Sequence, residues 1–126
     1  MPSAVSAATA EVVAAAQAIS QQTDGALDVT VGPLVRLWHF GPQKDQEPFA
    51  PPADDEVAAA LKNVGHQKLT VRTDPPALRK SVNGLEVDLS SIAPGYAIDR
   101  LARLLTEHGI DNFMVEIGGE VRAAGQ

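Results

Sequence analysis

One stretch in the last third of the chain decides how the sequence is interpreted: Val87-Asp88-Leu89-Ser90-Ser91-Ile92-Ala93-Pro94-Gly95-Tyr96-Ala97-Ile98-Asp99. Its pattern predicts a strand, a turn of small residues and the start of a helix. Small side chains let the backbone approach a ligand, and a helix N-terminus presents unpaired N–H groups. The stretch therefore predicts a site for a phosphate or a polar ring, with Asp88 beside it. Simple helix capping by Asp88 or Ser90 explains the same residues, and both interpretations stay open here.

The residues that follow predict an amphipathic helix and a hairpin. The helix starts at Pro94-Gly95-Tyr96, ends at His108-Gly109 and has four residues on its apolar face: Ile98, Leu101, Leu104 and Leu105. Two strands are expected at Phe113–Ile117 and Glu120–Ala124, joined at Gly118-Gly119. This diglycine is a candidate ligand platform, although a diglycine is more often a plain tight turn.

Strands and a helix are also expected just before the stretch. The strands are predicted at residues 68–72, 77–81 and 85–89, and Asn83-Gly84 is a hairpin signal expected to join the last two. The helix begins at Asp54-Asp55-Glu56, since acidic residues suit a helix N-terminus. Its predicted buried face consists of Val57, Ala60, Leu61 and Val64.

The first third of the chain predicts an alanine-rich helix that Ser3 caps, that runs to about Ile19 and that Gly25 stops. A strand is expected at residues 26–31, a short helix from Pro33 to Trp38, and a proline-rich surface loop at 40–54. The resulting order predicts an α+β (mixed α/β) fold with a mainly antiparallel sheet packed by helices. The 126 residues are expected to form one domain, cut from a longer protein at both ends.

A second candidate site lies at Thr23-Asp24-Gly25-Ala26-Leu27-Asp28. A glycine turn opens the predicted strand here, and two acidic residues lie four positions apart. A turn with solvated carboxylates explains this segment without any ligand.

Composition excludes several classes of function. The formal net charge of −6 argues against nucleic acid and against an anionic membrane surface as partners. Cysteine is absent, and no apolar run reaches the roughly 20 residues of a membrane span. His39, His66 and His108 lack the spacing of metal ligands, and the chain has no P-loop, dinucleotide fingerprint or Gly-x-Ser-x-Gly elbow.

Taken together, the candidate segments resemble the ApbE family in the same order along the chain. The resemblance is carried by residues 23–34 with Leu37-Trp38 and Phe40-Gly41-Pro42, by Val64-Gly65-His66-Gln67-Lys68-Leu69, by residues 88–99, and by residues 109–120. It covers nearly the whole chain. The resemblance implies a T-fold-related flavin transferase domain, of which this chain is a part.

The activity implied by the resemblance is that of an FAD:protein FMN transferase. Such an enzyme cleaves the pyrophosphate of FAD, joins FMN to a Thr or Ser of a target protein and releases AMP, assisted by Mg²⁺. An acidic chain with few lysines suits a metal ion that neutralises the phosphates. The implied targets include subunits of ion-pumping redox complexes. The implied compartment is the periplasmic side of a bacterial inner membrane, where relatives are exported or anchored by a lipid.

The resemblance also assigns site residues. It places FAD contacts at Ala26, Leu27 and Asp28 and a flavin-binding acid at Asp88. Ser91 falls where the family offers a backbone carbonyl to the metal. Position 94 of this chain falls where the family faces the flavin. Relatives commonly have Lys or Glu at that position, whereas this chain has Pro94, which leaves only a backbone contact. No catalytic residue is assigned.

The family's other metal ligands, an Asp and a Thr or second Asp, are expected downstream of these residues, so the 126-residue chain alone is expected not to transfer FMN. Two alternatives remain on the sequence alone: a flavin-binding module without transfer activity, and a structural or interaction domain.

Overall fold

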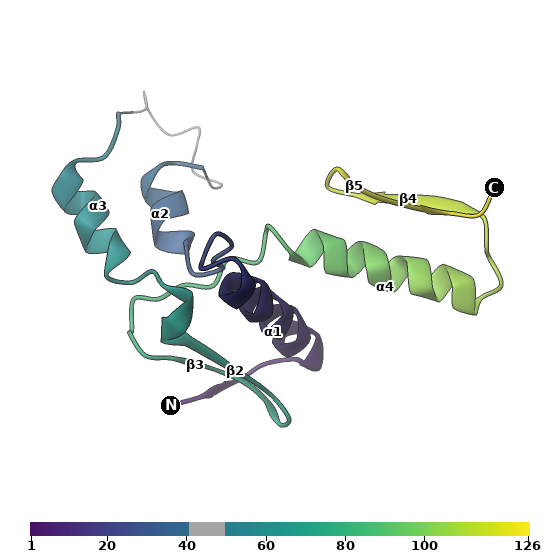
Figure 1. Ribbon diagram of the computed structural model, residues 1–126, viewed down its shortest axis with the longest axis horizontal. Coiled ribbons are helices and arrows are strands. Elements are labelled where there is room, and N and C mark those ends of the chain that lie inside the picture. Colours follow the sequence, from purple (N-terminus) through teal and green to yellow (C-terminus); the bar gives the residue numbers. More distant parts are fainter. Residues whose placement is uncertain (41–49) are drawn as a thin grey trace. The chain divides into compact units, whose positions relative to one another are not determined.

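The chain divides into two units, Met1–Asp88 and Leu89–Gln126, in a computed structural model that describes residues 1–40 and 50–126 (Figure 1). Helices and antiparallel strands occur in both, which confirms the predicted mixed α/β class. That residues 1–126 belong to one domain stays a prediction. No helix in the described ranges is long and apolar enough to cross a bilayer.

The first unit contains a three-stranded antiparallel sheet with the order β1-β3-β2 (Ser3–Ala4, Pro76–Lys80 and Leu69–Thr73). Strands β2 and β3 form a hairpin in which Val71 pairs with Leu78. Their bounds agree with the predicted strands to within one residue. The hairpin closes at Asp74-Pro75, immediately between the two strands.

Helix α1 (Ala7–Gln22) packs against β2 and β3 of this sheet. Its cap is Ser6, whose hydroxyl accepts a hydrogen bond from the Thr9 amide at 3.0 Å. The predicted cap at Ser3 is wrong, because Ser3 is in extended backbone and pairs with Leu78 of β3. The helix buries mainly small residues, Ala10, Val12, Val13 and Ala16, which lets it lie close to the strands.

Two predicted strands do not form. The only β pairing between residues 26–31 and 85–89 is an isolated parallel bridge, between Val31 and Glu86. In the first segment the Asp28 side chain bonds to the Thr30 amide, and such a local turn competes with an extended ladder. Leu85 in the second segment is completely buried, so hydrophobic burial holds that segment without strand pairing.

The hairpin predicted at Asn83-Gly84 is also wrong, although a turn is present there. The Leu85 amide donates to the Val82 carbonyl at 3.3 Å, as in a β-turn. The ammonium group of Lys80 then donates to the Leu85 carbonyl at 2.9 Å. This contact from the end of β3 holds the start of the 85–89 segment, where the second strand of the hairpin was expected.

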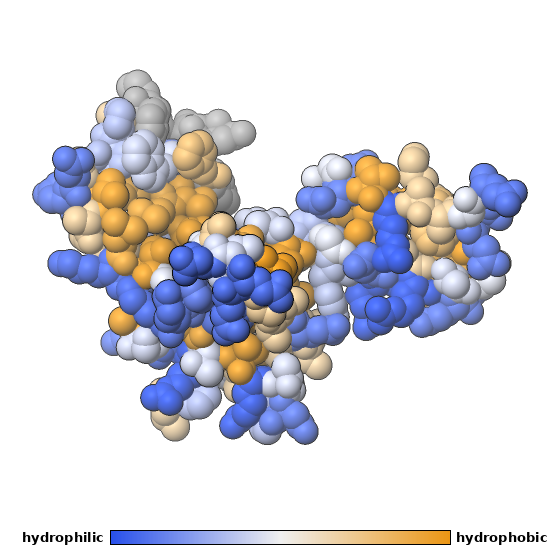
Figure 2. Space-filling view, viewed as in Figure 1, coloured by the Kyte–Doolittle hydropathy of each residue, from blue (hydrophilic) through white to orange (hydrophobic). Residues whose placement is uncertain are grey.

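Helices α2 (Gly32–Leu37) and α3 (Asp54–Leu61) pack against each other, and both were predicted. The carboxylate of Glu56 in the first turn of α3 accepts a hydrogen bond from the Ala53 amide at 2.9 Å. The predicted buried face of α3 is wrong, because no residue of the helix is buried and Leu61 keeps 50% of its surface exposed. Figure 2 shows apolar surface over these two helices. Of the predicted loop at 40–54, residues 41–49 lie outside the described residues, as do Gly41-Pro42 of the family resemblance.

A short 3-10 helix, η1 (His66–Lys68), leads from α3 into β2. The Lys68 ammonium group donates to the carbonyls of Lys62 (2.8 Å) and Val64 (2.7 Å), which follow the last turn of α3. Cations near carbonyls at a helix C-terminus stabilise it. Lys68 therefore ties the end of α3 to the start of the hairpin.

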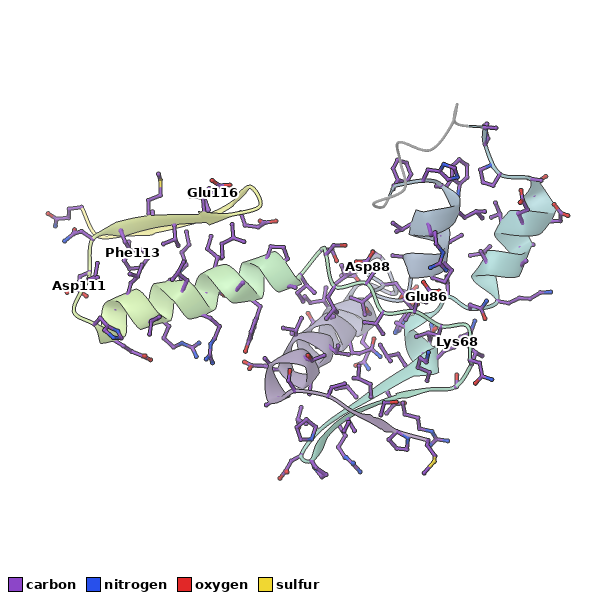
Figure 3. The ribbon with its side chains drawn as sticks, turned by 180° about the vertical axis from the view of Figure 1, so that it is seen from behind. Lys68, Glu86, Asp88, Asp111, Phe113 and Glu116 are labelled. Carbon is purple, nitrogen blue, oxygen red and sulfur yellow. The ribbon has the colours of Figure 1, made fainter. Side chains whose placement is uncertain are left out.

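The second unit consists of α4 (Ala93–Glu107) and the hairpin of β4 (Phe113–Ile117) and β5 (Glu120–Ala124). Both strands have their predicted bounds, and Gly109 (φ +74°) follows the helix as predicted. Figure 3 shows Phe113 on the side of β4 toward α4 and Glu116 on the opposite side. An ion pair between Asp99 of α4 and Arg122 of β5 also links these elements.

The apolar face predicted for α4 is partly wrong. Ile98 and Ala102 are buried, but Leu101 and Leu104 keep 36% and 49% of their surfaces exposed. A two-stranded hairpin covers only one stripe of a helix, and within this unit that stripe contains Ile98 and Ala102.

An ion pair between α2 and the 85–88 segment gives a testable pH dependence. The Arg36 guanidinium donates to both carboxylate oxygens of Glu86, at 2.7 and 2.5 Å. This hydrogen bonding lowers the pKa of Glu86 from its ordinary value of 4.5 and raises the pKa of Arg36. Because the pKa of Glu86 is lower in the folded than in the unfolded state, the ion pair stabilises the fold when the pH is above the unfolded-state pKa. This stabilisation is lost as the pH falls through the folded-state pKa.

We expect Glu86→Gln to lower the urea midpoint of unfolding at neutral pH, and the difference from the unsubstituted chain to vanish well below pH 4.5. Because both side chains are largely exposed, high salt should also reduce the difference. The control is the same substitution in an Arg36→Gln background. An equal loss in that background would contradict the assignment to the pair.

Candidate functional site

The first candidate segment, residues 23–28, forms a turn at the end of α1. Asp24 (φ +52°) and Gly25 (φ +81°) both adopt left-handed backbone, and the Gly25 amide donates to the Ser20 carbonyl at 2.8 Å. Gly25 therefore stops the helix as predicted. The imidazole of His66 also lies against it, since a Cβ placed on Gly25 would be 3.6 Å from the ring.

The side chains of Ser20, in the last turn of α1, and Thr23, its C-cap residue, both bond to the backbone of Leu27. The Ser20 hydroxyl lies 2.6 Å from the Leu27 carbonyl and 2.9 Å from the Ala16 carbonyl, and its single hydrogen can donate to either. The Leu27 amide donates to the Thr23 hydroxyl at 3.4 Å. Ser20 is completely buried. The backbone at the centre of the candidate segment is therefore positioned by the last turn of the helix.

The Asp28 carboxylate connects two segments that are far apart in the sequence. Its Oδ1 accepts from the amide (2.8 Å) and the hydroxyl (2.7 Å) of Thr30, and its Oδ2 accepts from the His66 amide (2.8 Å). Hydrogen bonds to a carboxylate are stronger than those between neutral groups. The side chain that was expected to contact a ligand is thus also a structural link between residues 28–30 and η1.

Two further side chains, those of Thr30 and Gln17, form hydrogen bonds to the segment around η1. The Thr30 hydroxyl, which is completely buried, accepts from the Gly65 amide at 2.7 Å. The Gln17 carboxamide of α1 donates to the carbonyls of His66 (2.9 Å) and Leu69 (2.5 Å). The segment from Gly65 to Leu69 is therefore bonded to both the turn and the helix.

The second candidate segment meets this turn through Asp88. The Asp88 amide donates to the Val29 carbonyl at 2.7 Å, next to the Asp28–Thr30 contacts. Asp88 is partly exposed, and Figure 3 shows it on the same segment as Glu86. The structure therefore brings together Asp88 and the turn that contains Ala26, Leu27 and Asp28. The role of these residues as ligand contacts stays a prediction.

Ser91 and Pro94 lie at the start of the second unit. Ser91 is exposed in the turn before α4, where the amides of Ile92 and Ala93 donate to the Leu89 carbonyl at 3.0 and 2.7 Å. Pro94 is the second residue of α4 and is partly exposed. The N-cap residue is Ile92, so neither Asp88 nor Ser90 occupies that position. Neither residue is therefore the N-cap of α4, and the roles of Ser91 and Pro94 stay predictions.

The diglycine of the third candidate forms a tight turn. Gly118 (φ +60°) and Gly119 (φ +93°) both have left-handed backbone, and the Gly119 amide donates to the Glu116 carboxylate at 2.9 Å. The plain-turn interpretation accounts for these contacts. Across residues 1–40 and 50–126, no three His, Cys, Asp or Glu side chains gather as metal ligands.

Sequence reasoning missed the contributions of Gln17, Ser20 and Thr30. A signal for Thr30 was present, because Asp28-Val29-Thr30 has the spacing at which an Asp side chain bonds two residues ahead. No pattern indicated Gln17 and Ser20, because their partners depend on how α1 packs against the turn and η1.

The link made by Asp28 can be tested without any ligand. We expect Asp28→Asn to lower the free energy of unfolding by about 1–3 kcal/mol, because either orientation of the amide turns its NH₂ group toward an N–H or O–H donor. The measurement is urea unfolding followed by far-UV circular dichroism. The matched control is Asp24→Asn, at an exposed position whose left-handed backbone suits Asn equally well. Equal stability of the two variants would contradict the link.

Comparison with known proteins identifies the family. The model of the ApbE family matches residues 1–126. The chain is 42% identical over 126 residues to the FAD:protein FMN transferase of Escherichia coli strain K12, covering 98% of this chain and 35% of that protein. It is 47% identical over 124 residues to the protein of the same name from Vibrio cholerae, covering 98% and 36%.

Solved structures agree with this result. The flavin transferase ApbE from Vibrio cholerae matches with a TM-score of 0.91 and 46% identity, covering 99% of this chain and 39% of that one. The apo form of the flavinyl transferase ApbE from Pseudomonas stutzeri matches with a TM-score of 0.87 and 36% identity, covering 100% and 40%. The chain spans about a third of the length of the curated relatives it matches. On the family match over its whole length, this chain belongs to the ApbE family.

Proposed function

We propose that this chain provides the flavin-binding part of an FAD:protein FMN transferase. The observation that carries the proposal is the contact between the Ala26–Asp28 turn and Asp88, made by the Asp88 amide and the Val29 carbonyl at 2.7 Å. These two segments are the ones for which the family resemblance implies FAD contacts. Relatives at 42% and 47% identity that carry this name support the assignment.

The proposed reaction is a transfer of FMN through its phosphate. A Ser or Thr hydroxyl of the acceptor protein forms a bond to the FMN phosphorus, and the bond from that phosphorus to the bridging oxygen of the pyrophosphate breaks. AMP leaves with the electron pair of that bond, and the hydroxyl proton is released. Catalysis of such transfers consists mainly of positioning and charge stabilisation.

In this chain the positioning is assigned to backbone and acidic groups. The turn at Ala26, Leu27 and Asp28 offers backbone groups held in place by α1, and Asp88 offers a carboxylate that can accept hydrogen bonds from the flavin. Pro94 retains only a backbone contact, because its side chain has no polar group.

Three cations of the first unit are already engaged within the fold, which is consistent with a metal requirement. The ammonium groups of Lys68 and Lys80 are bonded to backbone carbonyls, and the Arg36 guanidinium is paired with Glu86. When bound, Mg²⁺ would neutralise the phosphate charge, and its preference for oxygen ligands and water suits a carbonyl such as that of Ser91. The described residues supply no cluster of metal-ligating side chains, so the remaining ligands are assigned to phosphate oxygens, water and other parts of the protein.

The acceptor and the compartment follow from the family resemblance. We propose a flavoprotein acceptor, such as a subunit of an ion-pumping redox complex, on the periplasmic side of a bacterial inner membrane. The net charge of −6 is consistent with a partner other than nucleic acid.

The first test is a fluorescence titration of FAD with the 126-residue chain, with and without Mg²⁺. We expect saturable quenching, strengthened by Mg²⁺, because the turn is already held by Ser20, Asp28 and Thr30 without a ligand. Riboflavin, which lacks the pyrophosphate, is the control ligand and should show no Mg²⁺ effect. No saturable binding of FAD would contradict the proposal and favour a structural or interaction domain.

The second test concerns transfer itself. We expect the 126-residue chain, which spans about a third of its relatives, to release no AMP from FAD and to flavinylate no acceptor peptide. AMP is measured by chromatography and flavinylation by in-gel fluorescence, with a full-length relative as positive control. Transfer by this chain alone would contradict the expectation. If the longer protein that contains this chain bound FAD but transferred no FMN, a non-catalytic flavin-binding module would be favoured instead.

A further inference from the structure

The hydroxyl of Thr30 is used both as a donor and as an acceptor of hydrogen bonds. It donates to Asp28 Oδ1 at 2.7 Å and accepts from the Gly65 amide at 2.7 Å. The Thr30 amide donates to the same Asp28 oxygen at 2.8 Å. Thr30 is completely buried, so none of these bonds can be replaced by a contact with bulk water.

The chemistry required at this position is narrow. One group must donate to a carboxylate and accept from an amide at the same time, and among small side chains only Ser and Thr do so. Valine has the same shape as threonine but offers neither bond. In the Thr30→Val variant the Gly65 amide would lose its acceptor, and Asp28 would lose one of its three donors.

These bonds act on the candidate site through Asp28. With Thr30 in place, the carboxylate joins the turn to the His66 amide, and the adjacent Val29 carbonyl accepts from the Asp88 amide. The turn geometry of residues 28–30 therefore helps to fix the position of residues 26–28 relative to Asp88. A site that relies on backbone groups needs such support, because a displacement of about 1 Å weakens binding substantially.

We infer that Thr30 is a positioning residue for the flavin, holding the Ala26–Asp28 backbone and Asp88 in the arrangement that binds FAD. The inference rests on the proposed function. Thr30 itself touches no ligand in this account, because its hydroxyl is already used on both sides. Its effect on FAD is transmitted through Asp28 and the backbone at Val29.

The test compares three variants of the 126-residue chain by FAD titration in the presence of Mg²⁺. We expect Thr30→Val to weaken FAD binding by about tenfold or more, the fold-change that corresponds to one buried hydrogen bond. Thr30→Ser keeps the hydroxyl and should restore most of the affinity. Val13→Ala, in the buried face of α1, is the control for stability: it should lower the urea midpoint but leave the FAD affinity within about twofold.

Amide hydrogen exchange without ligand provides a second readout. Exchange at Gly65 and His66 should accelerate in Thr30→Val more than in Val13→Ala, because only the former removes an acceptor of that segment. Unchanged FAD binding by Thr30→Val, or an equal loss in Val13→Ala, would overturn the positioning role and leave the proposed function intact. Failure of the unsubstituted chain to bind FAD would overturn both.

Discussion

The hydrogen bonding of one carboxylate, that of Asp28, determines the local arrangement around the candidate site. It accepts bonds from Thr30 within its own turn and from the His66 amide, which lies far along the chain. A carboxylate has two charged oxygens and about four acceptor positions, so it accepts more hydrogen bonds, and stronger ones, than a single neutral carbonyl or hydroxyl oxygen. The turn at residues 23–28, the 3-10 helix η1 and the segment at Asp88 are all connected directly or through one residue to this group.

This arrangement explains how a site can form on a segment without regular secondary structure. Loops are usually mobile because their backbone groups bond to water. Here the Leu27 carbonyl bonds to a buried serine, the Leu27 amide to a threonine and the Gly25 amide to the end of α1. The helix therefore fixes the turn, while the small side chain of Ala26 leaves the outer surface open.

Much of the fold could be predicted from local patterns, and the failures have identifiable causes. The hairpin of β4 and β5 was predicted with its bounds, because alternating residues flank a diglycine turn. The strands expected at residues 26–31 and 85–89 failed because an Asp–Thr contact and the burial of Leu85 override an alternating pattern. For the site, family resemblance indicated Ala26–Asp28 and Asp88. It could not indicate that Asp28 is bonded internally, since that depends on the position of η1.

Two basic residues of the first unit, Lys68 and Arg36, differ in the shape of the acceptor that each one meets. The single ammonium group of Lys68 donates to two carbonyls that follow α3, whereas two nitrogens of the Arg36 guanidinium donate to the two carboxylate oxygens of Glu86. A compact ammonium suits the first geometry and a planar fork the second. Exchange of lysine and arginine is commonly regarded as conservative in protein evolution. At positions 36 and 68 such an exchange would keep the charge but not the shape of the group. Homologous sequences should therefore rarely have lysine at position 36 or arginine at position 68.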